Sequence, residues 1–179
     1  NYTLSLTDCN GCVARDTTRV NCFTPPPTCT VTVVDSIRCF GDCNGRIRVE
    51  VMDGAIPFTY RWSNDSTGIS VSRLCTGTYT VTVTDGSNRT TTCTINLTQP
   101  SRINIVVNQI TPSSGSNGGA TTTIGGGTPG YTFSWTNSQG SVVGSSKDLS
   151  NVAPGDYRLL VTDSKGCTYS VSGTVSQPT

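Results

Sequence analysis

Histidine is absent from the 179 residues of this sequence. Its absence excludes catalytic triads and general-base mechanisms that use imidazole, and it argues against zinc sites built from cysteine and histidine. No apolar run approaches the ~18 to 20 residues that a membrane-spanning helix needs, and no basic and apolar leader is visible. We therefore expect no membrane span, and we interpret the sequence as a mature or excised piece rather than a whole precursor.

Charge is also scarce. The formal net charge is +1, which gives no reason to expect nucleic acid or an anionic membrane surface as a partner. Leu, Met, Lys and Glu, which favour helices, are few, whereas Gly, Thr, Ser and Val are abundant. This composition predicts an all-β protein. The nine cysteines indicate disulfides, which persist in oxidising compartments, so we expect an extracellular or cell-surface location.

The sequence contains an internal repeat. Residues 43–65 (CNGRIRVEVMDGAIPFTYRWSND) align without gaps on residues 116–138 (SNGGATTTIGGGTPGYTFSWTNS), so that Trp62 matches Trp135. Further on, residues 74–85 match residues 152–163. Such repeats predict two complete units, 29–101 and 102–179.

The first residues also fit the repeat, but at a late position in the unit. Residues 2–8 (YTLSLTD) match residues 79–85 and 157–163, and Cys12 stands where Cys167 stands. We therefore interpret residues 1–28 as the last two strands of an incomplete preceding repeat. Either the chain was cut from a longer tandem array, or these strands complete another molecule.

Each unit is predicted to consist of short strands. Segments such as IRVEV (47–51) and YTVTVTD (79–85) alternate apolar and polar residues with a period of two. Four dipeptides are expected to supply the positive φ of turns: Asp53-Gly54, Asp85-Gly86, Asn117-Gly118 and Lys165-Gly166. About seven strands in ~75 residues fit a small antiparallel β-sandwich. The predicted core residues are Trp62, Trp135, Tyr79 and Tyr157.

No group of residues predicts catalysis or a cofactor, and we expect no enzymatic activity. Asp8, Asp85 and Asp163 recur at the end of a strand, where they either cap their own turns or contribute to a calcium site; the turn role is favoured because no D-x-D-x-D spacing exists. Four tyrosines fall on the alternating register of core residues and are predicted to pack in the core: Tyr60, Tyr79, Tyr131 and Tyr157. Tyr169 is set apart from this register, and a sugar-stacking platform of all five is the alternative.

The cysteines fall into three groups. Cys39, Cys43, Cys75 and Cys93 lie in the first complete unit and are predicted to form two bridges, and Cys9, Cys12, Cys22 and Cys29 are predicted to form two more. Cys167 has no evident partner in its own unit, because Pro112 stands where the first unit has Cys39. It is expected to be either a free buried thiol or bonded to another chain or segment.

Together these motifs resemble the SprB-type repeat. The resemblance rests on Cys/Ser-Asn-Gly, then Gly-x-x-Pro-Phe/Tyr-Thr-Tyr/Phe-x-Trp-Ser/Thr-Asn, then Gly-x-Tyr-x-Val-x-Val-Thr-Asp and a later Cys-Thr. Such repeats occur in tandem arrays in surface adhesins of Bacteroidota, including gliding-motility adhesins. The resemblance implies Ig-like extracellular modules. Pro112 and the additional Cys43 and Cys75 depart from the pattern, which puts the shared disulfide scheme in doubt.

The resemblance also suggests O-glycosylation, because Bacteroidota attach glycans at Asp-Ser/Thr followed by an apolar residue or Thr. The sequences DTT, DSI and DST make Thr17, Ser36 and Ser66 candidates, although chance matches are expected in a chain so rich in Ser and Thr.

Our functional prediction is a structural module of a bacterial cell-surface filament or adhesin stalk. Its partners would be neighbouring repeats or identical subunits, with surface glycans as a further possibility. The alternative is a carbohydrate-binding module of a secreted protein, which would require aromatic residues outside the core register or a calcium-binding aspartate cluster.

Overall fold

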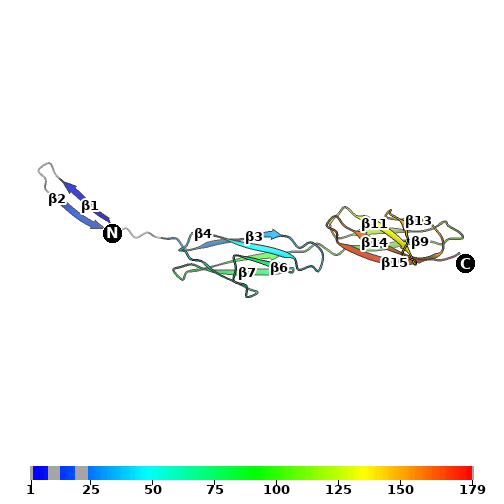
Figure 1. The fold of residues 1–179 in the computed structure, drawn as a ribbon, viewed down its shortest axis with the longest axis horizontal. Helices are drawn as coiled ribbons and strands as arrows, with labels where there is room; N and C mark the ends of the chain where they lie inside the picture. The colour runs from blue at the N-terminus through cyan, green and yellow to red at the C-terminus, as the bar shows by residue number, and fades with distance from the viewer. Residues whose placement is uncertain (1, 8–12, 19–23, 179) are drawn as a thin grey trace.

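The computed structural model describes residues 2–7, 13–18 and 24–178, and all regular elements in these ranges are β-strands. The all-β prediction is therefore confirmed. Figure 1 shows two β-sandwiches that follow one another along the long axis. Across the described residues no helix is long and apolar enough to cross a membrane.

The first sandwich consists of two three-stranded antiparallel sheets. One sheet has the order β3-β4-β6 and the other has the order β5-β7-β8. Alternating burial along β4 places Ile47 and Val49 in the core, because successive side chains of a strand point to opposite faces. The strands are β3 (Thr28–Asp35), β4 (Gly45–Met52), β5 (Thr59–Trp62), β6 (Ser70–Leu74), β7 (Gly77–Thr84) and β8 (Thr90–Leu97).

The second sandwich repeats this plan with one additional edge strand. Its sheets have the orders β13-β10-β9 and β12-β11-β14-β15. The short strand β12 pairs with β11 and is the edge strand of its sheet. In the first sandwich β5, which pairs with β7, is itself the edge strand. The strands are β9 (Asn104–Thr111), β10 (Gly118–Gly125), β11 (Thr132–Asn137), β12 (Val142–Gly144), β13 (Leu149–Val152), β14 (Gly155–Thr162) and β15 (Thr168–Val175).

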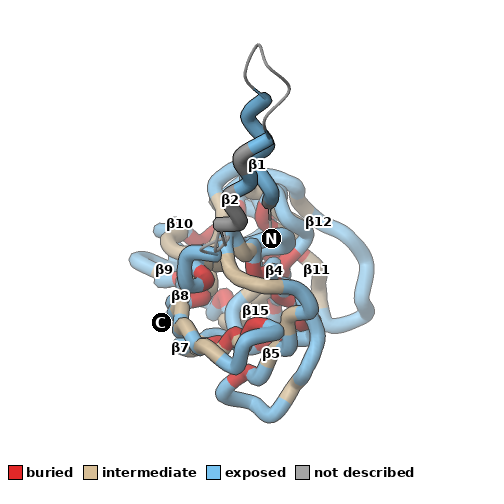
Figure 2. The backbone as a smooth tube through the Cα atoms, turned by 90° about the vertical axis from the view of Figure 1, so that its left-hand side faces the viewer, coloured by how far each residue is buried: buried red, intermediate tan, exposed pale blue. Residues whose placement is uncertain are grey.

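Each sandwich has its own hydrophobic core, and Figure 2 shows the buried backbone positions enclosed by exposed ones. Trp62 and Trp135 are each 2% exposed, and their indole nitrogens donate to Gly68 O and Ser146 O. Because a buried N–H must find an acceptor, these bonds let the ring sit at the centre of the sandwich.

A tyrosine near the start of β7 and a tyrosine near the start of β14 each bond back to the preceding loop. Tyr157 is buried and donates to Ala153 O at 2.8 Å, and Tyr79 is partly buried and donates to Cys75 O at 3.0 Å. This four-residue back-bond is the tyrosine corner found in Ig-like sandwiches.

The amino-terminal strands β1 (Tyr2–Thr7) and β2 (Val13–Thr18) form an antiparallel hairpin. Tyr2 lies opposite Thr18 and Thr7 lies opposite Val13. The pairs at the aligned positions are Tyr79 with Ile95 and Thr84 with Thr90 in β7-β8, and Tyr157 with Gly173 and Thr162 with Thr168 in β14-β15. All three hairpins therefore share one register.

The glycine prediction was only half right. Gly54 and Gly166 have positive φ, but Gly86 and Gly118 do not. Gly118 begins β10, where an added Cβ would lie 2.6 Å from Val175 and 2.7 Å from Ser113 Cβ. The glycine of Asn117-Gly118 is thus required by close packing between the two sheets rather than by a turn.

Candidate functional site

The most distinctive feature of the molecule is the joint between the two sandwiches. The loop after β3 carries Cys39, and the turn between β14 and β15 carries Cys167. The two sulfur atoms form a disulfide of 2.02 Å across a sequence separation of 128 residues. One covalent bond therefore ties the end of the first sandwich to the beginning of the second, in addition to the peptide chain.

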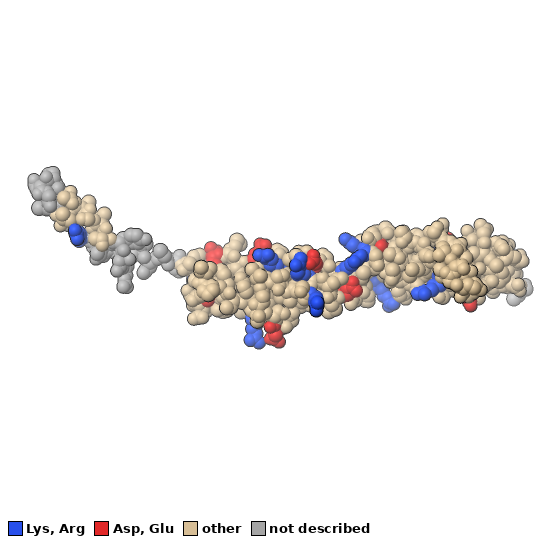
Figure 3. All heavy atoms as spheres, viewed as in Figure 1, with Lys and Arg blue, Asp and Glu red and all other residues tan. Residues whose placement is uncertain are grey.

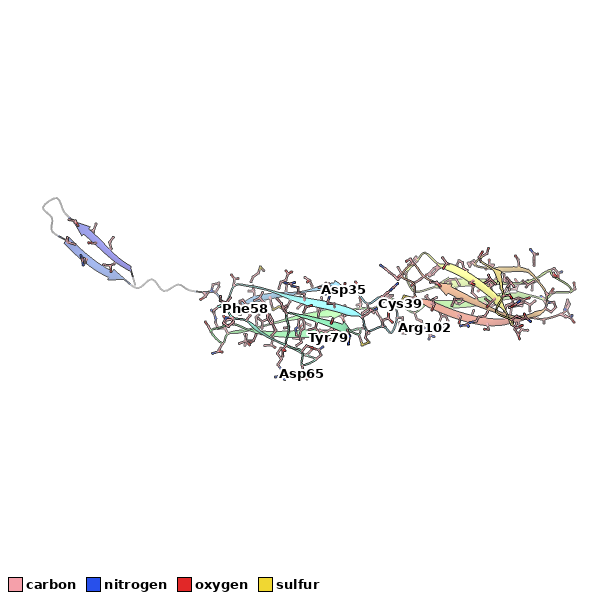
Figure 4. The ribbon with its side chains drawn as sticks, viewed as in Figure 1. Asp35, Cys39, Phe58, Asp65, Tyr79 and Arg102 are labelled. Atoms are coloured by element: carbon pink, nitrogen blue, oxygen red, sulfur yellow. A yellow bond between two sulfur atoms is a disulfide. The ribbon has the colours of Figure 1, made fainter. Side chains whose placement is uncertain are left out.

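Polar contacts reinforce this joint. Arg38 donates from Nε to Lys165 O at 2.6 Å, and this bond crosses between the sandwiches next to the disulfide. The guanidinium of Arg102 stacks over the ring of Tyr169, with its Cζ 4.5 Å from the ring centroid. Figure 3 shows Lys and Arg side chains where the sandwiches meet, and Figure 4 labels Cys39 and Arg102 there.

Two further disulfides lie within the first sandwich. Cys29 of β3 bonds to Cys93 of β8, and this bridge joins the two sheets. Cys43 bonds to Cys75 in the loop between β6 and β7. The five-residue loop from Cys39 to Cys43 is therefore held by a disulfide at each end.

The structure corrects the predicted cysteine pairing. Cys167 is not a free thiol but bonds to Cys39, which confirms the alternative expectation of a bond to another segment, here one of the same chain. Cys93 bonds to Cys29 instead of to a cysteine within 39–75. The reason is that spacing within a unit does not reveal which loops meet across a joint or between sheets. Because Cys29 bonds to Cys93, the prediction of two bridges among Cys9, Cys12, Cys22 and Cys29 is wrong. Cys9, Cys12 and Cys22 lie outside the described residues.

Asp163 connects the joint to the second sandwich. Its Oδ1 accepts from the backbone N–H of Lys165 and Cys167 at 2.9 Å, and its Oδ2 accepts from Thr128 N at 2.8 Å. Burial of the carboxyl raises its pKa, but the backbone hydrogen bonds outweigh burial and hold the pKa below its ordinary value. The aspartate thereby fixes the turn that presents Cys167.

Asp85 occupies the same place in the first sandwich, where Arg89 replaces the cysteine. Its carboxylate accepts from the backbone N–H of Ala55, Ser87 and Arg89, and the Arg89 side chain adds two bonds of 3.0 and 2.7 Å. Burial alone would raise the pKa of Asp85, but these bonds lower it to about 2.

The aspartate geometry fits turn capping rather than calcium. The hydrogen bonds above occupy both carboxylate oxygens with donors, whereas a calcium site needs several converging oxygen ligands. Within the described ranges no group of three or more His, Cys, Asp or Glu side chains could hold a metal ion. Asp8 lies outside these ranges.

A groove of about 600 Å³ runs along one side of the joint. The first sandwich contributes Phe40 and Asp42 to its wall, the connecting segment contributes Arg102, and the second sandwich contributes Tyr169. Phe40 was not singled out from the sequence, although its place in the loop outside the alternating register was a signal that could have found it.

The glycosylation candidates are dispersed. Ser36 is exposed just after β3, and Ser66 is half-buried in the loop between β5 and β6. Thr17 lies in β2, opposite Thr3. The structure does not bring these residues together.

Comparison with known proteins identifies the repeat in the first sandwich. Residues 31–67 match the SprB repeat. The resemblance to this family is thus confirmed over the segment from β3 to the loop after β5. No curated protein matches the sequence.

Solved structures that resemble this chain include Ig domains of cell adhesion molecules and repeats of adhesion proteins. The N-terminal eight Ig domains of Down Syndrome Cell Adhesion Molecule (DSCAM), isoform 1.30.30, align with 99% of this chain at a TM-score of 0.52 and 14% identity. This chain spans 28% of that protein's solved length, and at such identity the likeness shows the fold alone.

Two further solved structures align less well. The tetra-tandem repeat in the extending region of a large adhesion protein is 16% identical, with 97% of this chain and 55% of that chain covered, and a TM-score of 0.30. The BSP domain of a biofilm associated protein is 18% identical, with 84% and 30% covered, and a TM-score of 0.29. Scores this low support neither a shared fold nor a shared function.

Proposed function

We propose that this chain is a structural module of a bacterial cell-surface adhesin stalk or filament. The observation that carries the proposal is the Cys39–Cys167 disulfide, which joins the first sandwich, with its match to the SprB repeat, end to end to the second sandwich. Cys167 belongs to the core of the second sandwich and Cys39 packs against that core, so the bond anchors a loop of the first sandwich there and limits how far the sandwiches can bend apart. Limited bending is useful to a stalk, which must keep an adhesive tip away from the cell.

The joint combines covalent and non-covalent restraints. Arg38 reaches across to Lys165, and Pro100 lies in the short connection between the sandwiches. Proline fixes its own φ, so a connection of this kind has few conformations to lose when the joint forms. The units of the stalk are proposed to be 29–101 and 102–179, with the joint between them.

The amino-terminal hairpin is proposed to belong to a further unit. Its register equals that of β7-β8 and β14-β15, yet Leu4 and Leu6 are 62% and 64% exposed. The aligned residues of the first sandwich, Val81 and Val83, are completely buried. A sheet face of this kind is stable when other strands cover it, so neighbouring repeats or identical subunits are the proposed partners. Residues 1–28 are thus proposed to complete a sandwich.

An extracellular or cell-surface location fits the three disulfides in the described part of the chain, because such bonds persist in oxidising compartments. O-glycosylation at Thr17, Ser36 and Ser66 stays a proposal. Intact mass measurement of material from its natural source, before and after deglycosylation, tests it.

Small-angle X-ray scattering tests the stalk directly. The oxidised chain should give the scattering of a stiff rod, and the Cys39→Ser/Cys167→Ser variant should show a broader distribution of interatomic distances. The matched control is Cys43→Ser/Cys75→Ser, which removes a disulfide inside one sandwich and should leave the rod unchanged. Equal flexibility of the oxidised chain and the Cys39→Ser/Cys167→Ser variant would contradict the proposal.

A further inference from the structure

The loop Cys39–Cys43 presents an aromatic side chain to solvent in a restrained conformation. Phe40 is 53% exposed, although a phenyl ring gains free energy from burial. Cys39 on one side is bonded to Cys167, and Cys43 on the other side is bonded to Cys75. Within the loop, Gly41 N donates to Gln99 Oε1 at 2.9 Å. The ring therefore projects from a support that can move little.

The repeat itself does not require this exposed ring. The aligned residue of the second unit is Ser113, which is completely buried and donates from Oγ to Gly115 O at 2.8 Å. That loop contains no cysteine and no aromatic residue. Since the same position turns inward in one sandwich and outward in the other, the exposure of Phe40 is specific to the joint.

Phe40 is surrounded by apolar surface and by charged side chains of both signs. Phe40 and Asp42 line the groove of about 600 Å³ together with Arg102 and Tyr169. A groove of this volume lies within the ~300 to 1,000 Å³ range of small-ligand sites. Its walls come from both sandwiches, and the Cys39–Cys167 bond fixes the distance between them.

The polar groups of the groove retain capacity for a ligand. Asp42 Oδ2 accepts from Asn44 Nδ2 at 3.0 Å, but an ionised carboxylate offers roughly four lone-pair sites. Arg102 lies over the ring of Tyr169, with its Cζ 4.5 Å from the centroid, and its guanidinium carries five N–H donors. The groove thus offers an acceptor and several donors beside an exposed ring.

From this arrangement we propose that the joint groove binds a neutral oligosaccharide. A pyranose ring has one apolar C–H face, which would pack on Phe40, and a rim of hydroxyl groups that both donate and accept. Asp42 accepts from these hydroxyls and Arg102 donates to them. The opposite charges of the two side chains give no preference for a charged sugar. Restraint of the loop by two disulfides lowers the entropy lost on binding.

The binding experiment uses the complete oxidised chain and four neutral probes: cellohexaose, laminarihexaose, mannohexaose and chitohexaose. Titration calorimetry and saturation-transfer NMR measure the affinity for each. We expect at least one probe to bind. Phe40→Ala should weaken its affinity about tenfold or more, and Asp42→Asn about threefold.

Ile56→Ala is the matched control, because Ile56 is 83% exposed in the loop before β5 and does not line the groove. The affinity of Ile56→Ala for the bound probe should equal that of the unchanged chain. The proposal is overturned if no probe binds to the oxidised chain, or if Phe40→Ala binds as tightly as the unchanged chain. Since Phe40 is exposed, Phe40→Ala should keep its fold, which circular dichroism verifies.

This inference adds a ligand to the proposed stalk without depending on its stiffness. Failure of glycan binding would leave the rod-like scattering of the oxidised chain intact. Conversely, a flexible joint would contradict the stalk even if a sugar bound. The binding experiment and the scattering experiment therefore test the two proposals independently.

Discussion

Removing the Cys39–Cys167 disulfide should change how much chain the protein releases when it is pulled from its ends. Tension entering at the amino terminus passes along β3 to Cys39, crosses the disulfide to Cys167 and leaves through β15. Residues 40–166 are then outside the force path. The second sandwich can lose only β15 to extension while the bond holds.

The magnitude follows from the disulfide map. In Cys39→Ser/Cys167→Ser, the force crosses instead from Cys29 to Cys93, so residues 94–166 enter the path and residues 30–38 leave it. At about 3.4 Å per extended residue, this exchange adds roughly 220 Å of contour length. The extra length should appear in one step, because the second sandwich has a single core of its own.

Single-molecule force spectroscopy measures this step when the chain is placed between identical handle domains. The control is Cys43→Ser/Cys75→Ser, whose bridge lies wholly within the segment that tension bypasses, so its contour length should not change. Treatment of the unchanged chain with a reductant that reaches all three bonds should release still more. If the oxidised chain and Cys39→Ser/Cys167→Ser released equal lengths, the joint would not carry tension as argued.

Three stability predictions follow from the cores and the turn. Trp135→Ala should destabilise the second sandwich by about 3 to 5 kcal/mol, because the ring is almost fully buried. Urea unfolding followed by circular dichroism measures this loss, while the fluorescence of the remaining Trp62 reports the first sandwich separately. Tyr157→Phe should cost about 1 kcal/mol in the same assay through loss of the bond to Ala153 O. The pKa of Asp85 lies at about 2, below its ordinary value of 3.8. The ionised carboxylate should therefore stabilise the fold fully above about pH 4, and this stabilisation should disappear as the pH falls towards 2. The difference in unfolding midpoint between the unchanged chain and Asp85→Asn should shrink over the same pH range.

Each of these predictions has a contrary result. If Trp135→Ala lowered the unfolding midpoint of the first sandwich, reported by Trp62, as much as the midpoint of the second sandwich, the two cores would unfold as one unit. An unchanged midpoint in Tyr157→Phe would show that water replaces the lost bond without cost. A difference between Asp85→Asn and the unchanged chain that stays constant from pH 6 to pH 2 would contradict the hydrogen-bonded carboxylate.

The strands were predictable from the sequence because burial imposes a local period of two on them. The ungapped alignment of residues 43–65 with 116–138 places β4 over β10 and β5 over the start of β11. Trp62 and Trp135 could be assigned to the core for the same reason, since a large aromatic ring in an alternating strand is seldom left exposed. These features depend on nearby residues along one strand.

The joint could not be predicted because it depends on contacts between distant segments. Cys39 and Cys167 are separated by 128 residues and belong to different sandwiches, so no spacing within a unit links them. The solvent exposure of Phe40 has the same origin, since only the three-dimensional course of its loop turns it outward. The Asn117-Gly118 dipeptide predicts a turn, and the prediction is wrong because a dipeptide does not reveal how closely the opposite sheet approaches.

The disulfide at the joint also determines what happens when a protease cuts the chain. A single cut in the exposed loop after β5, for example near Asp65, separates the polypeptide into two pieces. The pieces remain one covalent molecule, because all three disulfides, Cys29–Cys93, Cys39–Cys167 and Cys43–Cys75, span the cut. Any single cut between residues 40 and 166 leaves the two ends connected in this way. A protein exposed to the proteases of its surroundings can thus be nicked without being severed.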